Sequence, residues 1–408
     1  MRAFPLVALG LLVVGCGGDL ALVPHSVTLV EQTETVPEDE LLDVGVVVFD
    51  PGIPDGEVEK EVLEALIEEG TFVHVRRTEA RYLAVHLRNT LQKSGHWGTV
   101  WTMPGESSSA DINITAAILY SDGERFRLRV HAADAIGNTW IDDEYEVKTA
   151  PGSFNRQQYP GLDPYQDVFN RIANDLAARK DALSAEHKRH IRTVAQLRFA
   201  ADLSPEAFGD HVVQEQSGQY ALSRLPADDD PQFQRTLQVR QREHLFVETL
   251  NEHYVDFYEN SKDAYHAWRE TAREEAVAIR KLEGSSRWNT VLGILAIVGS
   301  VAYELASDGD LMDDVISDTL MYSGASLLNS AELHRQEKQI HVSALEELSQ
   351  SFDEEIKPIV VEIEGVQHRF TGTVEAQYED WRELLRQIYL QETGFDSVQM
   401  YTDVLRDH

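Results

Sequence analysis

After Pro231 the chain runs to Glu283 without a glycine or a further proline. Because these two residue types are the ones that interrupt helices, the stretch predicts one very long helix, or two long helices that meet near Asn260 and Ser261. Apolar and aromatic side chains recur along it, a stripe more typical of a core or a partner interface than of a cofactor site. Its members are Leu245, Phe246, Leu250, Tyr254, Phe257, Tyr258, Tyr265 and Trp268.

The rest of the chain from about residue 160 also reads as mainly helical. An apolar stripe predicts a helix just after Pro164, a second helix is expected over 185–201, and Ser204 is expected to cap a third. Near the end, IVVEIEGVQHRFTG predicts two short strands about Gly365, followed by a helix that Thr373 caps. We therefore expect a mainly helical domain over 160–408.

The preceding part, residues 43–150, predicts a small α/β domain. An unbroken apolar run in LDVGVVVFD is typical of a strand that is covered on both faces. A helix carrying Leu83, Leu87 and Leu91 should end at Gly95. Alternating segments then predict an antiparallel meander, in which the arginine stripe of RFRLRVHAA faces solvent. The predicted fold class is α+β, an α/β domain with a meander followed by a helical bundle, a short hairpin and a terminal helix.

The single cysteine, Cys16, follows a short positive segment and an apolar core, in the order Val13, Val14, Gly15 and Cys16. This order resembles the lipobox of bacterial lipoproteins. The resemblance implies that residues 1–15 are a removed signal peptide and that Cys16 carries acyl chains. Gly17 in place of aspartate implies the outer membrane, with the chain facing the periplasm. Residues 16–42 would then be the anchor and a flexible tether.

Residues 43–147 resemble the N-terminal domain of TolB and the periplasmic domain of curli-secretion-type lipoproteins. Small motifs carry this resemblance, with an insertion after the first strand, and their residues are Leu91, Ser94, Gly95, Ala110, Asp111, Asp134 and Gly137. In those families the domain docks other envelope proteins and is not catalytic. The resemblance therefore implies an envelope protein as partner.

An apolar segment, WNTVLGILAIVGSVAY at 288–303, lies within an expected helix over 288–306. It is shorter than the roughly 20 residues of a membrane-spanning helix. One interpretation is a buried central helix of the bundle. The other is a helical hairpin over 288–331 that inserts into a membrane or self-associates, although four aspartates in its turn, Asp308, Asp310, Asp313 and Asp314, would have to cross the bilayer.

The composition and the motifs exclude several kinds of site. The formal net charge of −34 disfavours nucleic acid and anionic lipid headgroups as general partners. His187 and His190 share a helix face but lack a third metal ligand, and DGDLMDD lacks the EF-hand order. The HExxH, GxSxG and phosphate-binding glycine patterns are absent. We expect no catalytic residue, metal or cofactor.

Three functions fit these observations. The first is a non-catalytic envelope lipoprotein, anchored through Cys16, that acts as a docking or assembly factor. The second is a membrane-inserting or pore-associated component that uses residues 288–331. The third is a cell-wall or glycan hydrolase that acts through carboxylates between domains. The sequence does not indicate the oligomeric state.

Overall fold

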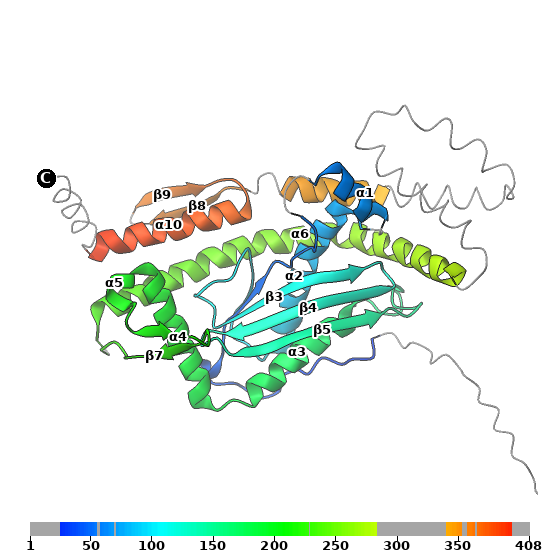
Figure 1. The fold of residues 1–408 in the computed structure, drawn as a ribbon. Helices are drawn as coiled ribbons and strands as arrows, with labels where there is room; N and C mark the ends of the chain where they lie inside the picture. The colour runs from blue at the N-terminus through cyan, green and yellow to red at the C-terminus, as the bar shows by residue number, and fades with distance from the viewer. Residues whose placement is uncertain are drawn as a thin grey trace, which may run out of the picture.

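The computed structural model describes residues 25–54, 58–68, 71–227, 229–283, 340–352, 357–363 and 365–393. Its fold is α+β, as the sequence predicts: a sheet with covering helices comes first, and a mainly helical part with a short hairpin and a terminal helix follows (Figure 1). Cys16 and the apolar segment at 288–306 lie outside the described residues.

The sheet has five strands in the order β2-β1-β3-β4-β5. The short strand β1, next to the edge strand β2, pairs in parallel with both β2 and β3, and β3, β4 and β5 form the predicted antiparallel meander. The bounds are β1 Val44–Val47, β2 Val100–Met103, β3 Ile112–Ser121, β4 Arg125–Asp134 and β5 Thr139–Lys148. Because side chains on both of its faces are buried, β1 is an apolar run rather than an alternating one.

Strand β4 shows why one face of the meander is polar. Its residues alternate between exposed and buried, with Phe126 and Leu128 inside. On the outer face Arg129 pairs with Asp142 of β5, with 2.7 Å between Nη2 and Oδ1. The arginine stripe is thus the solvent-facing side of the sheet, as predicted.

Helices α2 (Val73–Ser94) and α3 (Gln166–Asp181) pack together on the inner face of the sheet. The apolar positions of α2 are buried as its periodicity requires, and the helix ends where Gly95 takes a left-handed conformation with φ of 71°. The insertion before α2 forms a short helix, α1 (Lys60–Glu68).

The long glycine-free stretch forms one continuous helix, α6 (Pro231–Glu283), of 53 residues and about 80 Å. It runs past the outer edge of the sheet and packs against α2 and β2. There Asn251 accepts a hydrogen bond from the backbone N–H of Thr102 at 3.0 Å, and Glu248 accepts one from the Trp101 indole at 3.1 Å. A side chain of α6 therefore accepts a hydrogen bond from the edge strand β2, whose backbone N–H would otherwise be unpaired at the sheet edge.

The N-terminal segment differs from the expected tether. Ser26 donates both its backbone N–H and its hydroxyl to Asp167 of α3, at 2.8 and 3.0 Å. A 3₁₀ turn over Glu38–Glu40 then contacts α4 (Ala185–Leu203), where Arg189 pairs with Asp39 at 2.6 Å. Residues 26–42 are therefore bound along α3 and α4, and the flexible-tether prediction is wrong for them. Polar side chains of α3 and α4, which sequence periodicity does not assign to any partner, hold this segment.

A second difference follows α4. The helix that Ser204 was expected to cap is one turn long, α5 (Pro205–Phe208), and the Ser204 side chain makes no capping hydrogen bond. A small two-stranded sheet, β6 (Val212–Gln214) with β7 (Tyr220–Leu222), comes next. The Pro at the first helical position starts the turn, but no apolar stripe follows to extend it.

The C-terminal elements agree with the prediction. Strands β8 (Ile359–Ile363) and β9 (Val366–Phe370) form an antiparallel hairpin about Gly365. Helix α10 (Val374–Thr393) follows, and the Thr373 hydroxyl accepts a hydrogen bond from its first turn at 3.2 Å. Figure 1 shows the hairpin and α10 lying along the N-terminal half of α6. A further helical segment over 340–352 packs on α2 and α6 through Leu345 and Phe352.

One hydrophobic cluster includes residues of the sheet, of α2 to α4, of α6 and of the C-terminal elements. In particular, Phe126 of β4 stacks on Tyr165, with 4.5 Å between ring centroids, and lies near Phe169 of α3. The expected boundary between a domain at 43–150 and another at 160–408 therefore does not separate two cores within the described residues. Helix α3 supplies the inner cover that the sheet needs.

Candidate docking groove

The sequence contains one histidine pair at metal-ligand spacing, which was not expected to be a metal site because it lacks a third ligand. His187 and His190 of this pair lie on α4 with ring centroids 6.4 Å apart. Among the residues that the structure describes, no group of three or more histidine, cysteine, aspartate or glutamate side chains could hold a metal ion. Searched over the same residues, the helices include none long and apolar enough to span a bilayer.

A buried arginine, Arg269, joins α6 to the loop before α3. Its guanidinium donates two hydrogen bonds to Asp163, at 2.8 and 2.7 Å, and both side chains are almost fully buried. The ring of Tyr265 lies 4.1 Å from it, and the rings of Tyr165 and Tyr82 lie at 4.9 and 5.7 Å. Burial alone would raise the pKa of Asp163, but the Arg269 charge outweighs it and holds that pKa below its usual value. A two-point contact of this kind fixes the rotation of α6 on the domain.

The same cluster extends to Glu79 on α2. This fully buried carboxylate accepts hydrogen bonds from the hydroxyls of Ser121 and Tyr265 and lies 3.3 Å from the Arg76 guanidinium. Burial is the largest cause of the raised pKa of Tyr265, with the Glu79 charge next. The tyrosine therefore stays a neutral donor to the carboxylate.

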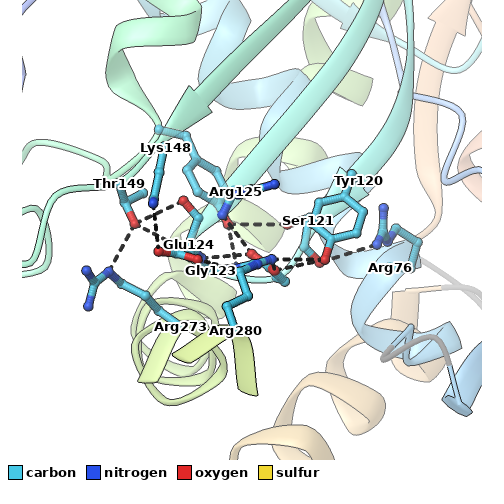
Figure 2. Close-up of polar contacts among 12 residues, drawn as sticks. Arg76, Tyr120, Ser121, Gly123, Glu124, Arg125, Lys148, Thr149, Arg273 and Arg280 are labelled. Atoms are coloured by element: carbon cyan, nitrogen blue, oxygen red, sulfur yellow. Dashed lines mark hydrogen bonds and ion pairs between the residues drawn. The ribbon is translucent and has the colours of Figure 1, made fainter. Parts of the chain in front are cut away.

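Figure 2 shows the polar contacts of the turn between β3 and β4, which follows Ser121. Arg280 of α6 pairs with both Asp122 and Glu124 of the turn, and Lys148 of β5 lies 3.4 Å from Glu124. Gly123 has φ of +82°, and a Cβ there would lie 2.2 Å from the backbone oxygen of Arg269. The turn is thus packed directly on the α6 backbone. We call the pairing of Asp122, Gly123 and Glu124 with α6 the turn clasp.

Two further buried carboxylates hold α6 at its other end. Asp111, before β3, accepts a hydrogen bond from the backbone of Asp43 at 2.9 Å and one from Arg240 at 3.3 Å. Burial raises the pKa of Asp111 to about 6, although Arg240 opposes the rise. Glu243 accepts hydrogen bonds from the hydroxyls of Tyr378 and Ser107, at 2.9 and 3.2 Å. Each carboxylate is occupied by groups of neighbouring elements, an arrangement that joins those elements.

A groove of about 400 Å³ lies between α6 and the C-terminal hairpin. Helix α6 supplies one wall, β8 supplies the other, and α10 contributes a single tryptophan. The lining residues are Arg242, Leu245, Phe246, Thr249, Val360, Val361, Glu362, Ile363 and Trp381. Strand β9 occupies one edge of β8 and lines no part of the groove, so the groove follows the other edge of β8.

The floor of the groove is a rigid aromatic cluster. Phe246 stacks on Trp381, with 4.5 Å between centroids and a 5° interplanar angle, and Phe370 of β9 meets both rings edge-on. Trp381 is 1% exposed, and its indole Nε1 has no hydrogen-bond partner among the described residues. A buried indole N–H usually finds an acceptor, so this donor is unsatisfied within the packed cluster.

The rim of the groove is apolar and exposed. Leu245 of α6 is 71% exposed, and Val360 of β8 is 54% exposed. A leucine in the apolar stripe of a long helix would normally be buried against the core of the protein. Adjacent exposed apolar residues next to an unpaired strand edge are typical of an interaction surface.

The two charges in the lining are of opposite sign. Arg242 lies 3.7 Å from Glu392 of α10, whose carboxylate already accepts a hydrogen bond from Arg235 at 2.8 Å. Glu362 of β8 is the second charged lining residue. The groove therefore carries almost no net charge, in a chain whose formal net charge is −34.

Comparisons with protein-family models, with curated proteins and with solved structures found no match to this chain. The function is therefore argued from the geometry of its own residues.

The sequence did not predict the groove. Its elements were predicted, including the α6 stripe and the hairpin, but Leu245 was assigned to the stripe with its buried neighbours. One signal was available in β8, where the exposed face carries Val360 and Glu362. A valine at an exposed position of a short hairpin was a sign that this face could contact another element or a partner. Periodicity assigns a residue to a face of its own element and does not show which faces of two elements lie together.

Proposed function

We propose that this chain is a non-catalytic lipoprotein of the bacterial cell envelope that docks other envelope proteins. The observation that carries the proposal is the apolar groove between α6 and β8, with Leu245 and Val360 exposed at its rim. The groove lies on a rigid framework, because the turn clasp and the Asp163–Arg269 pair fix α6 to the sheet. Preorganised apolar surfaces of this kind bind partners without a large ordering cost.

The position of the first described residues supports anchoring through Cys16. Residues 26–42 are bound along α3 and α4, so residues 17–24 alone separate the cysteine from His25. An extended chain of that length spans at most about 30 Å. A chain acylated at Cys16 would therefore hold its folded part close to the periplasmic surface of the outer membrane. The resemblance of residues 43–147 to envelope docking domains supports the same assignment.

The state of the buried acids favours docking over hydrolysis. A glycosidase needs two carboxylates that face a shared cleft, one to donate a proton and one to act as nucleophile or base. Glu79, Asp163 and Glu243 instead hold arginine or tyrosine partners from neighbouring elements. Among the described residues that line the groove, Glu362 is the one carboxylate.

Site-specific photo-cross-linking in cells tests docking. A photoreactive residue at Leu245 should form covalent adducts with an envelope protein, and one at Leu225 should not. Leu225 is the matched control, because it is a leucine of similar exposure, 62% against 71%, and lies before α6. Equal adducts at both positions, or none at Leu245, would overturn the docking assignment.

Membrane fractionation tests the anchor. A Cys16→Ser chain exported by an ordinary cleavable signal should be soluble in the periplasm, whereas the wild type should stay in carbonate-washed membranes. Retention of the Cys16→Ser chain in the washed membrane would instead favour the membrane-inserting function of residues 288–331.

A further inference from the structure

The groove runs beside an unpaired strand edge. In the part of the chain that the structure describes, β8 has β9 as its one strand neighbour, and the Ile359 N–H donates to the Gln377 side chain at 3.2 Å. The groove is lined by the next four residues of β8, which indicates that it follows the other edge of the strand. Backbone N–H and C=O groups at such an edge pair readily with another extended chain. Helix α6 forms the opposite wall through Leu245 and Thr249, which leaves a channel beside β8 for a single strand.

The floor gives that strand a preformed apolar surface. Trp381 lines the groove, and its ring is stacked on Phe246 with 4.5 Å between centroids. Because both rings are buried in the cluster, this surface is in place before the partner arrives.

The side chains of the walls define the sequence that fits. Val361 and Trp381 line the groove and are buried or half-buried, whereas Val360 stands exposed at the rim. A strand laid along β8 directs every second side chain toward the floor. Apolar residues at alternate positions would therefore match the floor.

Charge selects among the possible occupants. Two copies of a chain with a net charge of −34 repel each other, which disfavours a second copy. The chain's own last residues, 394–408, contain three aspartates and one arginine, so they are also acidic. The groove itself is nearly neutral, with Arg242 and Glu362 in its lining. A neutral or basic segment of another protein is the occupant that the electrostatics favour.

We infer that the groove binds an extended, neutral-to-basic segment of another protein, which adds to β8 as a third strand and places apolar side chains on alternate positions against Phe246 and Trp381. This inference rests on the proposed docking function and specifies the kind of partner segment. Main-chain hydrogen bonds to β8 hold the segment, and the pockets for alternate side chains select its sequence.

Peptide binding to the full chain tests the inference. The probe is a capped peptide of about seven residues, alternating valine and threonine between terminal lysines. One control peptide, the N-methylated twin, has the same sequence with a methyl group on every internal amide nitrogen, which removes its backbone hydrogen-bond donors. A second control peptide, the acidic twin, has terminal glutamates in place of the lysines. We expect the N-methylated twin to bind at least about tenfold more weakly, because each lost backbone hydrogen bond contributes roughly this much. The acidic twin should also bind more weakly.

Two variants and one local probe locate the binding. Leu245→Asp should lower the affinity for the lysine peptide at least about tenfold, and the matched control Leu225→Asp should not change that affinity. Amide hydrogen exchange should slow in β8 on binding, while the amides of β6 should not change.

Each alternative outcome has a separate meaning. Equal affinity of the N-methylated twin, or unchanged exchange in β8, would overturn strand addition. If Leu245 still forms adducts in cells in that case, docking stands and only its mode is wrong. Adducts between two copies of the chain would assign the groove to a second copy. Tighter peptide binding after deletion of residues 394–408 would assign it to the chain's own end. Either result would overturn the inferred occupant.

Discussion

Replacement of Asp163 by asparagine tests whether α6 is locked to the domain by the buried ion pair. Asp163→Asn removes the charge and leaves the Arg269 guanidinium in place. The side chains of Asp163 and Arg269 are 3% and 1% exposed, so water cannot solvate the unpaired cation. Breaking a buried pair by removing one partner costs about 3–5 kcal/mol. The three tyrosine rings around Arg269 stay in place and do not replace the lost carboxylate. We therefore expect the free energy of unfolding to fall by about 3–5 kcal/mol at neutral pH.

The pH dependence separates the two partners. The folded-state pKa of Asp163 lies below its unfolded value near 4, so the pair stabilises the fold above that value and its contribution is lost as the pH falls through the folded value. In Arg269→Met, the buried Asp163 can take up a proton, so the loss of stability should shrink toward acid pH. In Asp163→Asn, the guanidinium stays charged, so the loss should be constant above about pH 4 and shrink only below it, where the wild type loses the contribution of its own pair.

Urea unfolding followed by tryptophan fluorescence measures these effects, and Trp268 lies beside the cluster, 6.2 Å from Tyr265 between ring centroids. The double variant Asp163→Asn with Arg269→Met should be more stable than the sum of the single losses implies, by at least about 2 kcal/mol. Additive single effects, or a loss below about 1 kcal/mol in Asp163→Asn, would refute the argument that the pair locks α6.

Two further predictions concern the ends of the same framework. Gly123→Ala should lower the free energy of unfolding by at least about 2 kcal/mol, because its φ of +82° is strained for alanine and its Cβ would lie 2.2 Å from the backbone oxygen of Arg269. The control Gly218→Ala, with φ of +87° and no atom within 4 Å, should lower it by only about 1 kcal/mol. Similar losses of the two variants in urea unfolding would contradict the turn clasp. Burial raises the folded-state pKa of Asp111 to about 6, above its unfolded value near 4. The free energy of unfolding should therefore fall by about 3 kcal/mol as the pH rises between these values, and Asp111→Asn should remove this fall. An unchanged slope of the unfolding free energy against pH between about 4 and 7 in Asp111→Asn would contradict the prediction.

Much of the fold follows from local signals in the sequence. The end of α2 at Gly95, the meander of β3 to β5 and the hairpin about Gly365 each depend on residues close together in the chain. The segment over 26–42 was mispredicted because its partners, such as Asp167 of α3, are more than 100 residues away. A polar segment without periodicity looks like a linker until the side chains that bind it are known.

The buried ion pair of Asp163 and Arg269 could not be predicted from the sequence for a related reason. Asp163 and Arg269 stand in ordinary polar surroundings in the sequence, and an acidic chain offers many similar residues. Their importance comes from burial, and burial depends on how α6 crosses the domain. The aromatic stripe of α6 was predicted as core or interface, and the structure shows it divided along the helix, with Tyr265 and Trp268 in the core and Leu245 at the groove.

This division bears on how the groove can bind a partner. Phe246 and Trp381 are buried whether or not the groove is occupied, so a partner gains little by reordering them. An occupant can bury Leu245 and Val360, and it can pair with the free edge of β8. Two exposed apolar side chains contribute about 1.5–3 kcal/mol each when fully buried. Because that gain is offset by the cost of ordering an extended segment, backbone pairing must supply the rest. The affinity of the groove should therefore depend more on the extended conformation of the partner than on the identity of any one of its side chains.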